Sequence, residues 1–194
     1  MTRSEQPLGE IILVRHGEST WNVSKRVQGQ CDDARLTARG QRQAREAAES
    51  LSGSTYDAIF SSDLSRALET AAIIAEVLGL EVHISSDLRE RGFGEIEGAP
   101  LEELTPELSG IADGRIVDAS ASPVDGETLD ELFTRISRFM ATILTRHRGE
   151  TVIVVTHGGT IRAIRAYLQR LPMSGLQWDA VTNCSIWPFD MAPD

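Results

Sequence analysis

The chain contains no apolar run of the roughly 20 residues that a membrane-spanning helix needs. Its N-terminal stretch, Met1 to Gly9, is polar and lacks the apolar region of a secretory signal peptide. Cysteine is scarce, because Cys31 and Cys184 are the only two, and their spacing is not that of a metal site. One disulfide could join them, but free thiols in a reducing cytosol suit so low a cysteine content better. These absences favour a cytoplasmic protein that binds no metal.

Positive charge is also in short supply. The 194 residues include 19 Lys and Arg against 29 Asp and Glu, and the formal net charge is −10 at pH 7. This balance disfavours non-specific binding to nucleic acid or to an anionic membrane surface, although it leaves room for a small basic pocket. Repeats and low-complexity segments are absent as well. With 41% hydrophobic and 25% charged residues, the chain has the composition of one globular domain spanning residues 1–194.

The apolar segments alternate between strand and helix patterns. The predicted strands cover residues 11–14, 57–60, 82–84, 151–156 and 185–189. The predicted helices follow Thr37, cover 64–78, follow Thr128 and pass through 161–168. The β-branched run at 151–156 is typical of a central strand buried on both faces, and Pro188 marks the last strand as an edge strand. This alternation predicts an α/β fold.

Residues 99–125 break the pattern. This stretch contains three prolines, two glycines and many acidic residues, with a short helix expected over 101–108. A long excursion inside a compact domain is often a lid or a binding loop. We therefore expect an acidic, lid-like insertion here.

Two predicted strands end in the same way, with a histidine followed by glycine. His16 follows the first strand and His157 follows the strand at 151–156. If these strands are parallel neighbours, the two imidazoles meet at the carboxyl edge of the sheet, where open α/β folds place their ligands. The strand at 57–60 ends at the same edge, and the helix after it carries Arg66 in its first turn, where free backbone N–H groups favour phosphate.

Four motifs follow one another in a familiar order. They are Arg15-His16-Gly17-Glu18 with Asn22, Ser61-Ser62-Asp63-Leu64-Ser65-Arg66-Ala67, Leu88-Arg89-Glu90-Arg91, and Thr156-His157-Gly158-Gly159. Together they resemble the histidine phosphatase superfamily, the phosphoglycerate-mutase-like proteins, from about residue 11 to residue 186. The resemblance implies a three-layer α/β/α sandwich with a mostly parallel central sheet.

The resemblance also implies a role for each residue that matches. His16 is the nucleophile that forms a phosphohistidine, and Glu90 is the general acid that later becomes the base activating water. The implied phosphate-binding residues are Arg15, Asn22, Arg66 and His157. The implied substrate-binding residues are Gln28, Gly29 and Gly158. No metal and no other cofactor is implied, and the expected partner is a small phosphorylated metabolite rather than nucleic acid or a membrane.

The choice between phosphatase and mutase rests on the excursion. Mutases of this family carry a tyrosine and a lysine where this chain has Phe93 and Leu101, and a longer insert with paired arginines. Between residues 98 and 126 this chain has Arg115 as its only cation, together with six acidic residues. Such a lid should repel a second phosphate or carboxylate, so the sequence favours the phosphatase branch and hydrolysis of phosphomonoesters.

Other functions are also compatible with the sequence. The alternatives are a cofactor-dependent phosphoglycerate mutase and a non-catalytic module that binds phosphorylated ligands, although the intact His16 and Glu90 argue against the module. Within the phosphatases, broad-specificity and α-ribazole enzymes are both compatible with the motifs. His83 and His147 are expected to be structural or exposed. The sequence carries no signal for an oligomeric state beyond Trp178 and Met191, which we expect to be exposed and available for a subunit contact.

Overall fold

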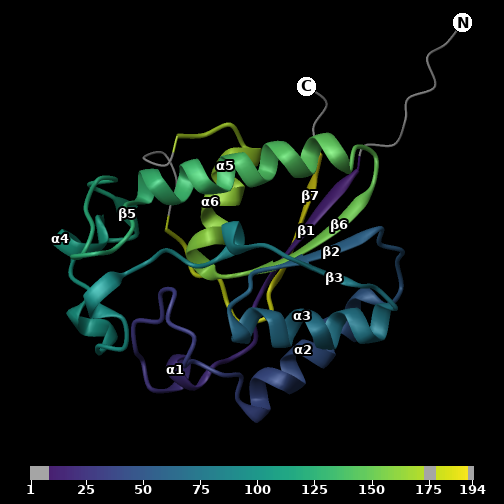
Figure 1. Cartoon of the computed structure of the whole chain (residues 1–194), viewed down its shortest axis with the longest axis horizontal. Coiled ribbons are helices and arrows are strands. Elements are labelled where there is room, and N and C mark those ends of the chain that lie inside the picture. Colours follow the sequence, from purple (N-terminus) through teal and green to yellow (C-terminus); the bar gives the residue numbers. More distant parts are fainter. Residues whose placement is uncertain (1–8, 173–177, 192–194) are drawn as a thin grey trace, which may run out of the picture.

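The computed structural model describes residues 9–172 and 178–191. Five strands form the central sheet in the order β3-β2-β6-β1-β7. Their bounds are β1 Glu10–Arg15, β2 Ala58–Ser61, β3 Val82–Ile84, β6 Thr151–Thr156 and β7 Ile186–Asp190. β1, β2, β3 and β6 run parallel, and β7 is antiparallel to β1 at one edge. The predicted central strand and edge strand are therefore confirmed (Figure 1).

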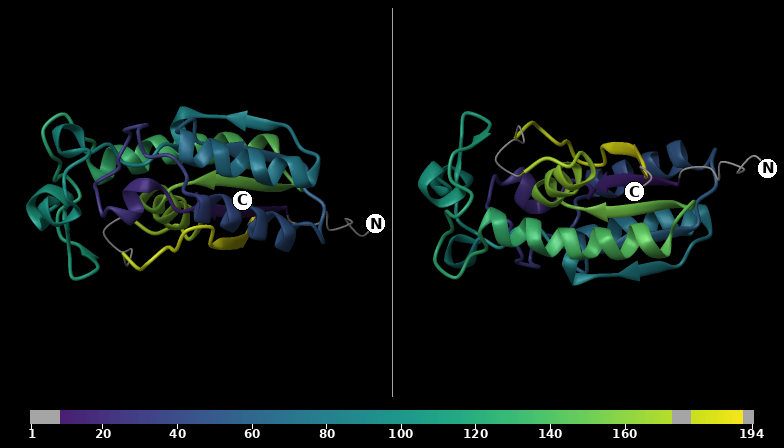
Figure 2. Two further views of the ribbon diagram at one scale, coloured as in Figure 1. Left: turned by 90° about the horizontal axis from the view of Figure 1, so that it is seen from below. Right: turned by 90° about the horizontal axis from the view of Figure 1, so that it is seen from above.

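Helices cover both faces of this sheet (Figure 2). They are α2 Ala38–Leu51, α3 Ser65–Leu78, α5 Leu129–Arg146 and α6 Gly158–Leu168. Alternate residues of β1 point to opposite layers: Ile11 and Leu13 pack in the core under α5 and α6, and Ile12 and Val14 pack in the core under α2 and α3. The predicted three-layer α/β/α sandwich with a mostly parallel sheet is confirmed.

The helix boundaries follow from local hydrogen bonding. The Thr37 side chain accepts a hydrogen bond from the Gly40 N–H at the start of α2. Thr128 and Glu131 form the predicted capping box at the start of α5, a motif in which each cap contributes about 1 kcal/mol. α3 ends at Gly79, whose φ of 69° is easily adopted only without a side chain. These caps determine where the helices begin and end relative to the strands.

The excursion at 99–125 is built from short elements, visible as the teal segment around α4 and β5 in Figure 1. They are the 3₁₀ helix η3 Leu101–Glu103, α4 Pro106–Ser109, β4 Ile111–Ala112 and β5 Arg115–Ile116. The short helix expected over 101–108 is present as two separate turns, η3 and α4. Thr105 precedes a proline and is extended, with ψ at 165°, because proline disfavours helical backbone in the residue before it.

Three further short helices complete the described chain: α1 Thr20–Val23, and the 3₁₀ helices η1 Ser86–Leu88 and η2 Gly94–Ile96. The expectation that Met191 and Trp178 are exposed is wrong, since Met191 is buried in the core and Trp178 is partly buried. The two cysteines are free thiols. Within the described residues, no helix has both the length and the apolarity needed to cross a bilayer.

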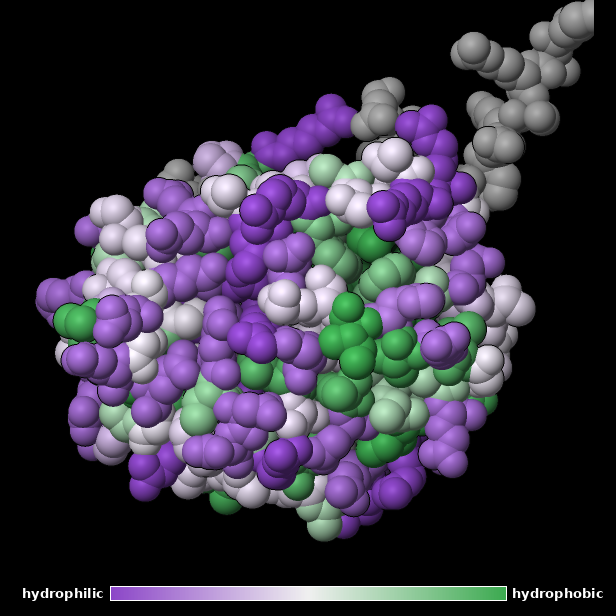
Figure 3. Space-filling model, viewed as in Figure 1, coloured by the Kyte–Doolittle hydropathy of each residue, from purple (hydrophilic) through white to green (hydrophobic). Residues whose placement is uncertain are grey.

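The surface seen in Figure 3 is mostly polar, with one apolar patch on the side where α3 and β3 lie. Exposed apolar side chains of these elements are Val77 and Ile84.

Candidate active site

Two histidines meet at the carboxyl edge of the sheet. β1 and β6 pair in register up to Arg15 and Thr156, so the next residue of each strand, His16 or His157, leaves the sheet at the same level. Their ring centroids are 5.1 Å apart. The His16 N–H donates to the Thr156 carbonyl, and both rings are buried. The structure thus places together the pair that parallel pairing predicts.

His16 is held in one tautomer. Its Nδ1 lies 2.7 Å from the Gly17 carbonyl oxygen. A carbonyl oxygen can only accept, so Nδ1 must carry the ring proton. The lone pair on Nε2 is then free to attack an electrophile. Gly17 is positioned in turn by its own N–H, which donates to the Thr70 hydroxyl at 3.0 Å.

The surroundings of His16 keep it neutral. Burial lowers the pKa of His16 well below its usual value of 6.5, and the positive charges of Arg66 and Arg15 lower it further. His157 has its pKa lowered well below 6.5 for the same reasons, with burial again the largest cause. A neutral imidazole at neutral pH is the nucleophilic form.

Three buried donors at this edge lack partners. Among the described residues, the buried side-chain atoms without a hydrogen-bond partner include Arg15 Nε, Arg66 Nε and His157 Nδ1. Leaving a buried donor unpaired costs about 1–3 kcal/mol, and more for a charged group. Such a cluster of orphaned donors around one histidine is what a bound oxyanion would satisfy.

Each of these groups is aimed by a neighbour. Arg66 donates from Nη1 to the Cys31 carbonyl at 3.0 Å and from Nη2 to the Gly29 carbonyl at 2.7 Å. Arg15 donates from Nη1 to the Val181 carbonyl. Both guanidinium groups are therefore fixed by backbone oxygens, which hold them without neutralising their charge.

Ser62 orients the second histidine. The His157 Nε2 lies 2.9 Å from the Ser62 hydroxyl oxygen, which also accepts a hydrogen bond from the Leu64 N–H. Ser62 can donate its proton to Nε2, which leaves the His157 ring proton on the unpartnered Nδ1. This arrangement gives the site a neutral donor beside the two arginines.

Asn22 and Gln28 present their amide nitrogens to the cleft. The Asn22 Oδ1 accepts from the Ser19 N–H and from Asn183 Nδ2. The Gln28 Oε1 accepts from the Ser19 hydroxyl at 2.8 Å. Because both carbonyl oxygens are occupied, the NH₂ group of each side chain is the free end. Asn22 lies on the short helix α1 rather than on the loop that the sequence suggested.

Glu90 reaches the site from the loop after β3. Its Oε1 accepts from the Arg91 N–H at 2.9 Å, and its Oε2 accepts from the Gly159 N–H at 3.0 Å. A Cβ atom on Gly159 would stand 2.4 Å from Glu90 Oε1, so only glycine leaves room for this carboxyl. The loop is anchored by the Thr160 hydroxyl, which donates to the Arg89 carbonyl at 2.7 Å.

Gly158 lines the cleft close to three functional side chains. A Cβ atom there would lie 3.2 Å from Arg162 Nη1, 3.8 Å from Arg15 Nε and 4.0 Å from Glu90 Oε2. Three functional groups thus converge on the first residue of α6. His157 makes no side-chain cap for this helix, and in its first turn the Gly159 N–H donates to Glu90 Oε2 instead.

The start of α3 differs from the expectation. The Ser65 N–H donates to Asp32 Oδ1 at 2.6 Å, and the Ser65 hydroxyl donates to Asp32 Oδ2 at 2.8 Å. The helix end that was predicted to offer free N–H groups to phosphate is therefore capped by a carboxylate from another loop. Arg66 itself remains at the site, and Asp32 is a positioning residue that the sequence analysis missed.

A cleft of about 270 Å³ lies beside these groups, and its lining includes Arg15 and Glu90 but not His16, Arg66 or His157. Its lining residues are Arg15, Trp21, Asn22, Lys25, Arg26, Val27, Gln28, Gly29, Glu90, Arg91, Phe93, Leu101, Leu104, Gly158, Gly159, Arg162, Trp178 and Val181. From the excursion at 99–125, the lining takes leucines and none of the six acidic residues. The expected repulsion of a second anion by an acidic lid therefore has no support, because none of these carboxylates lines the cleft.

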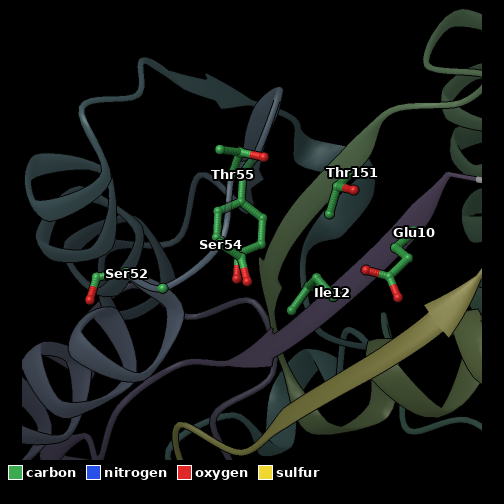
Figure 4. Close-up of a pocket in the computed structure, with 8 residues that line it drawn as sticks. Glu10, Ile12, Ser52, Ser54, Thr55 and Thr151 are labelled. Carbon is green, nitrogen blue, oxygen red and sulfur yellow. The ribbon is translucent and has the colours of Figure 1, made fainter.

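A larger hollow lies at the opposite edge of the sheet, and it lacks this chemistry. Figure 4 shows Glu10, Ile12 and Thr151 at the start of β1 and β6, with Ser52 and Thr55 across the gap. Its lining contains no cation and no histidine. Among residues 9–172 and 178–191, no three His, Cys, Asp or Glu side chains are grouped as a metal site requires.

His83 and His147 lie apart from the cleft. Each ring is close to Phe60, with centroid distances of 5.2 and 5.3 Å. His147 Nδ1 also lies 2.6 Å from Glu150 Oε2. His147 is partly buried and His83 is exposed, in agreement with the expectation that each is structural or exposed.

The sequence matches the family model of the histidine phosphatase superfamily (branch 1) over residues 11–194. Phosphoglycerate mutase-like protein 4 of Arabidopsis thaliana is 38% identical over 182 residues, which cover 91% of this chain and 77% of that protein. The probable phosphoglycerate mutase GpmB of Enterobacter sp. (strain 638) is 34% identical over 189 residues, covering 93% of this chain and 84% of the relative.

Solved structures of similar proteins have the same fold as this chain. The mycobacterial glucosyl-3-phosphoglycerate phosphatase in complex with VO3 superposes with a TM-score of 0.82 and 31% identity, covering 93% of this chain and 92% of that one. A phosphoserine phosphatase from Entamoeba histolytica, in complex with phosphoserine, has a TM-score of 0.80 and 29% identity, covering 94% of this chain and 90% of the other. Solved structures of named phosphatases thus share this architecture.

Proposed function

The chain belongs to the histidine phosphatase superfamily, branch 1, and we propose that it hydrolyses phosphomonoesters of small metabolites through a phosphohistidine on His16. Similar proteins are named as phosphatases and as mutases. One observation carries this proposal. A histidine with a free Nε2 lone pair is surrounded by three buried, unpartnered donors. That arrangement suits an electrophile that carries several negatively charged oxygens.

The first step forms the phosphoenzyme. His16 Nε2 attacks phosphorus while the bond from phosphorus to the ester oxygen breaks. The protonated carboxyl of Glu90 donates its proton to the departing alcohol oxygen, so the alcohol leaves neutral. Arg15, Arg66 and His157 hold the phosphoryl oxygens, whose charge is greatest in the transition state. Phosphorylation leaves the His16 ring cationic and therefore a good leaving group.

The second step is hydrolysis. The ionised Glu90 takes a proton from a water molecule as the water oxygen attacks phosphorus and the bond from nitrogen to phosphorus breaks. Inorganic phosphate forms, His16 returns to the neutral ring with its proton on Nδ1, and Glu90 is again protonated. The Gly17 carbonyl keeps the ring in this tautomer through both steps. The scheme uses no metal and no further cofactor.

A phosphoglycerate mutase is the second candidate. Two observations favour it: relatives with 34–35% identity are named probable phosphoglycerate mutases, and the cleft lining contains cations other than Arg15. A mutase returns the phosphoryl group to a bound hydroxyl instead of giving it to water. Phe93 and Leu101, in place of the tyrosine and lysine of mutases, remain the reason to prefer hydrolysis.

The experiment is a comparison of the wild-type protein with His16→Ala on p-nitrophenyl phosphate. We expect kcat to fall by at least about 10³-fold, because no other group forms the covalent intermediate. His147→Ala serves as the matched control, since this histidine lies outside the cleft. Turnover retained by His16→Ala contradicts the nucleophile assignment. Formation of 2-phosphoglycerate from 3-phosphoglycerate and 2,3-bisphosphoglycerate, faster than phosphate release, supports the mutase instead.

A further inference from the structure

The cleft holds more positive charge than one phosphoryl group requires. Four arginines and one lysine line it, against Glu90 as the only carboxylate of the lining. Arg15 and Arg66 already match the two negative charges of a phosphomonoester dianion. Arg91 is buried and bound by the carbonyls of Glu127, Ser109 and Ala121, so it acts within the protein. Arg26 donates to the Gly98 carbonyl. The cations that remain are Lys25 and Arg162.

Arg162 is fixed with one end facing the cleft. Its Nε and Nη2 both donate to the Asp179 backbone carbonyl, and its guanidinium lies over the Trp178 ring at 4.6 Å from the centroid. Its remaining Nη1 is the group found 3.2 Å from the position of a Cβ on Gly158. A planar guanidinium held in this way offers a directed donor at low entropic cost.

Lys25 also lines the cleft. It is the only lysine of the chain and is exposed, and its ammonium group makes no hydrogen bond or ion pair to another described residue. Its backbone is nevertheless well anchored, since its carbonyl accepts from the Leu101 N–H at 2.8 Å, and the next residue, Arg26, donates from its N–H to the Trp21 carbonyl at 3.0 Å. Its φ of 52° is unusual for a residue with a side chain. The chain thus holds an unpaired ammonium group at the edge of the cleft.

We propose that Lys25 and Arg162 form a second anion subsite, and that the substrate is a phosphomonoester with a second anionic group on its carbon skeleton. This inference rests on the proposed function, because the phosphoryl group must first lie against His16. A cleft of about 270 Å³ suits a small metabolite whose two anionic groups are separated by a few bonds. The subsite is built from the loop after α1 and from α6, and not from the excursion at 99–125.

The test uses substrates with matched leaving groups. D-3-phosphoglycerate and sn-glycerol 3-phosphate share a phosphorylated primary alcohol and differ in a carboxylate against a hydroxymethyl group. We expect kcat/KM for phosphate release to be at least about tenfold higher for the carboxylate, which corresponds to about 1.4 kcal/mol. Fructose 1,6-bisphosphate supplies a phosphate as the second anion, and comparing it with the carboxylate identifies the preferred group.

Substitutions then locate the subsite. Lys25→Ala should reduce the ratio of the two kcat/KM values by about tenfold, and Lys25→Arg should restore most of it. Arg45→Ala removes the same charge from an exposed position on α2, and the ratio should stay unchanged. A wild-type ratio near one, or a ratio that Lys25→Ala does not alter, overturns the subsite.

Hydrolysis of p-nitrophenyl phosphate separates this inference from the proposed function. If the wild-type protein hydrolyses that ester but does not discriminate between the matched pair, the subsite alone is refuted. If no ester is hydrolysed, the proposed function fails, and tryptophan fluorescence titration with the same two compounds decides on the subsite. Tighter binding of 3-phosphoglycerate that Lys25→Ala abolishes supports it, and equal binding refutes it.

Discussion

Replacing the two buried histidines should make the protein less sensitive to acid. His16 and His157 both have pKa values well below 6.5 in the folded protein, mainly because burial disfavours the charged ring. An unfolded chain protonates both rings near pH 6.5, so below that pH the unfolded state binds more protons than the folded state. The stability is therefore complete above pH 6.5 and falls as the pH drops below it. The double variant His16→Asn, His157→Asn lacks this contribution.

The magnitude follows from linkage. Between pH 7.5 and pH 5.5 an unfolded imidazole passes from about one-tenth to about nine-tenths protonated, and the native ring stays neutral because its pKa is far lower. Each ring then lowers the free energy of unfolding by about 1.4 kcal/mol over this interval, and the two together by about 2.7 kcal/mol. Over the same interval the double variant should lose that much less stability than the wild-type protein.

The assay is urea unfolding at several pH values in buffers that contain no phosphate, since an oxyanion that binds the native site would add its own stabilisation. His83→Asn, which changes an exposed histidine of β3, is the control and should keep the wild-type pH dependence. Parallel curves for the wild type and the double variant would refute the conclusion that both rings are neutral in the native state.

Three further outcomes are expected. Glu90→Gln should reduce kcat for an alkyl phosphate far more than for p-nitrophenyl phosphate, because a good leaving group needs little protonation; equal losses would assign the general acid to another residue. Gly159→Ala should lower kcat by about tenfold or more, since its methyl group would displace the Glu90 carboxyl, whereas Gly53→Ala, with nothing within 4 Å, should behave as the wild type. Activity should survive dialysis against EDTA; a loss that a divalent cation restores would contradict the metal-free scheme.

The sequence predicts the central sheet well because the position of a strand in the sheet determines how apolar its residues are. The run at 151–156 is apolar on both faces, which places it inside the sheet, and the histidines that end two such strands meet once the strands pair in parallel. Helix caps are likewise local, so Thr37 and Thr128 are readable from a few neighbouring residues. Features that depend on one turn or one strand can therefore be predicted from the sequence alone.

Features that depend on contacts between distant parts of the chain could not be predicted from the sequence. Asp32 caps α3 from a loop 33 positions away, and Asn183 fixes the Asn22 amide from 161 positions away. Lys25 and Arg162 carry no motif that marks them as neighbours of one cleft. The acidic residues of 99–125 look decisive in the sequence, but the side chains that this segment turns toward the cleft are leucines.

The charge of the site is maintained by how its arginines are paired. Arg15, Arg66 and Arg162 are held by backbone carbonyls, whereas Arg89, Arg135 and Arg165 form ion pairs with carboxylates. A carboxylate partner would position a guanidinium equally well but would cancel its charge and compete with the phosphoryl oxygens. Carbonyl oxygens position it and leave the full charge available. A chain with a net charge of −10 can thus concentrate positive potential at one edge of its sheet, and the number of cations left over there is what argues for a substrate with two anionic groups.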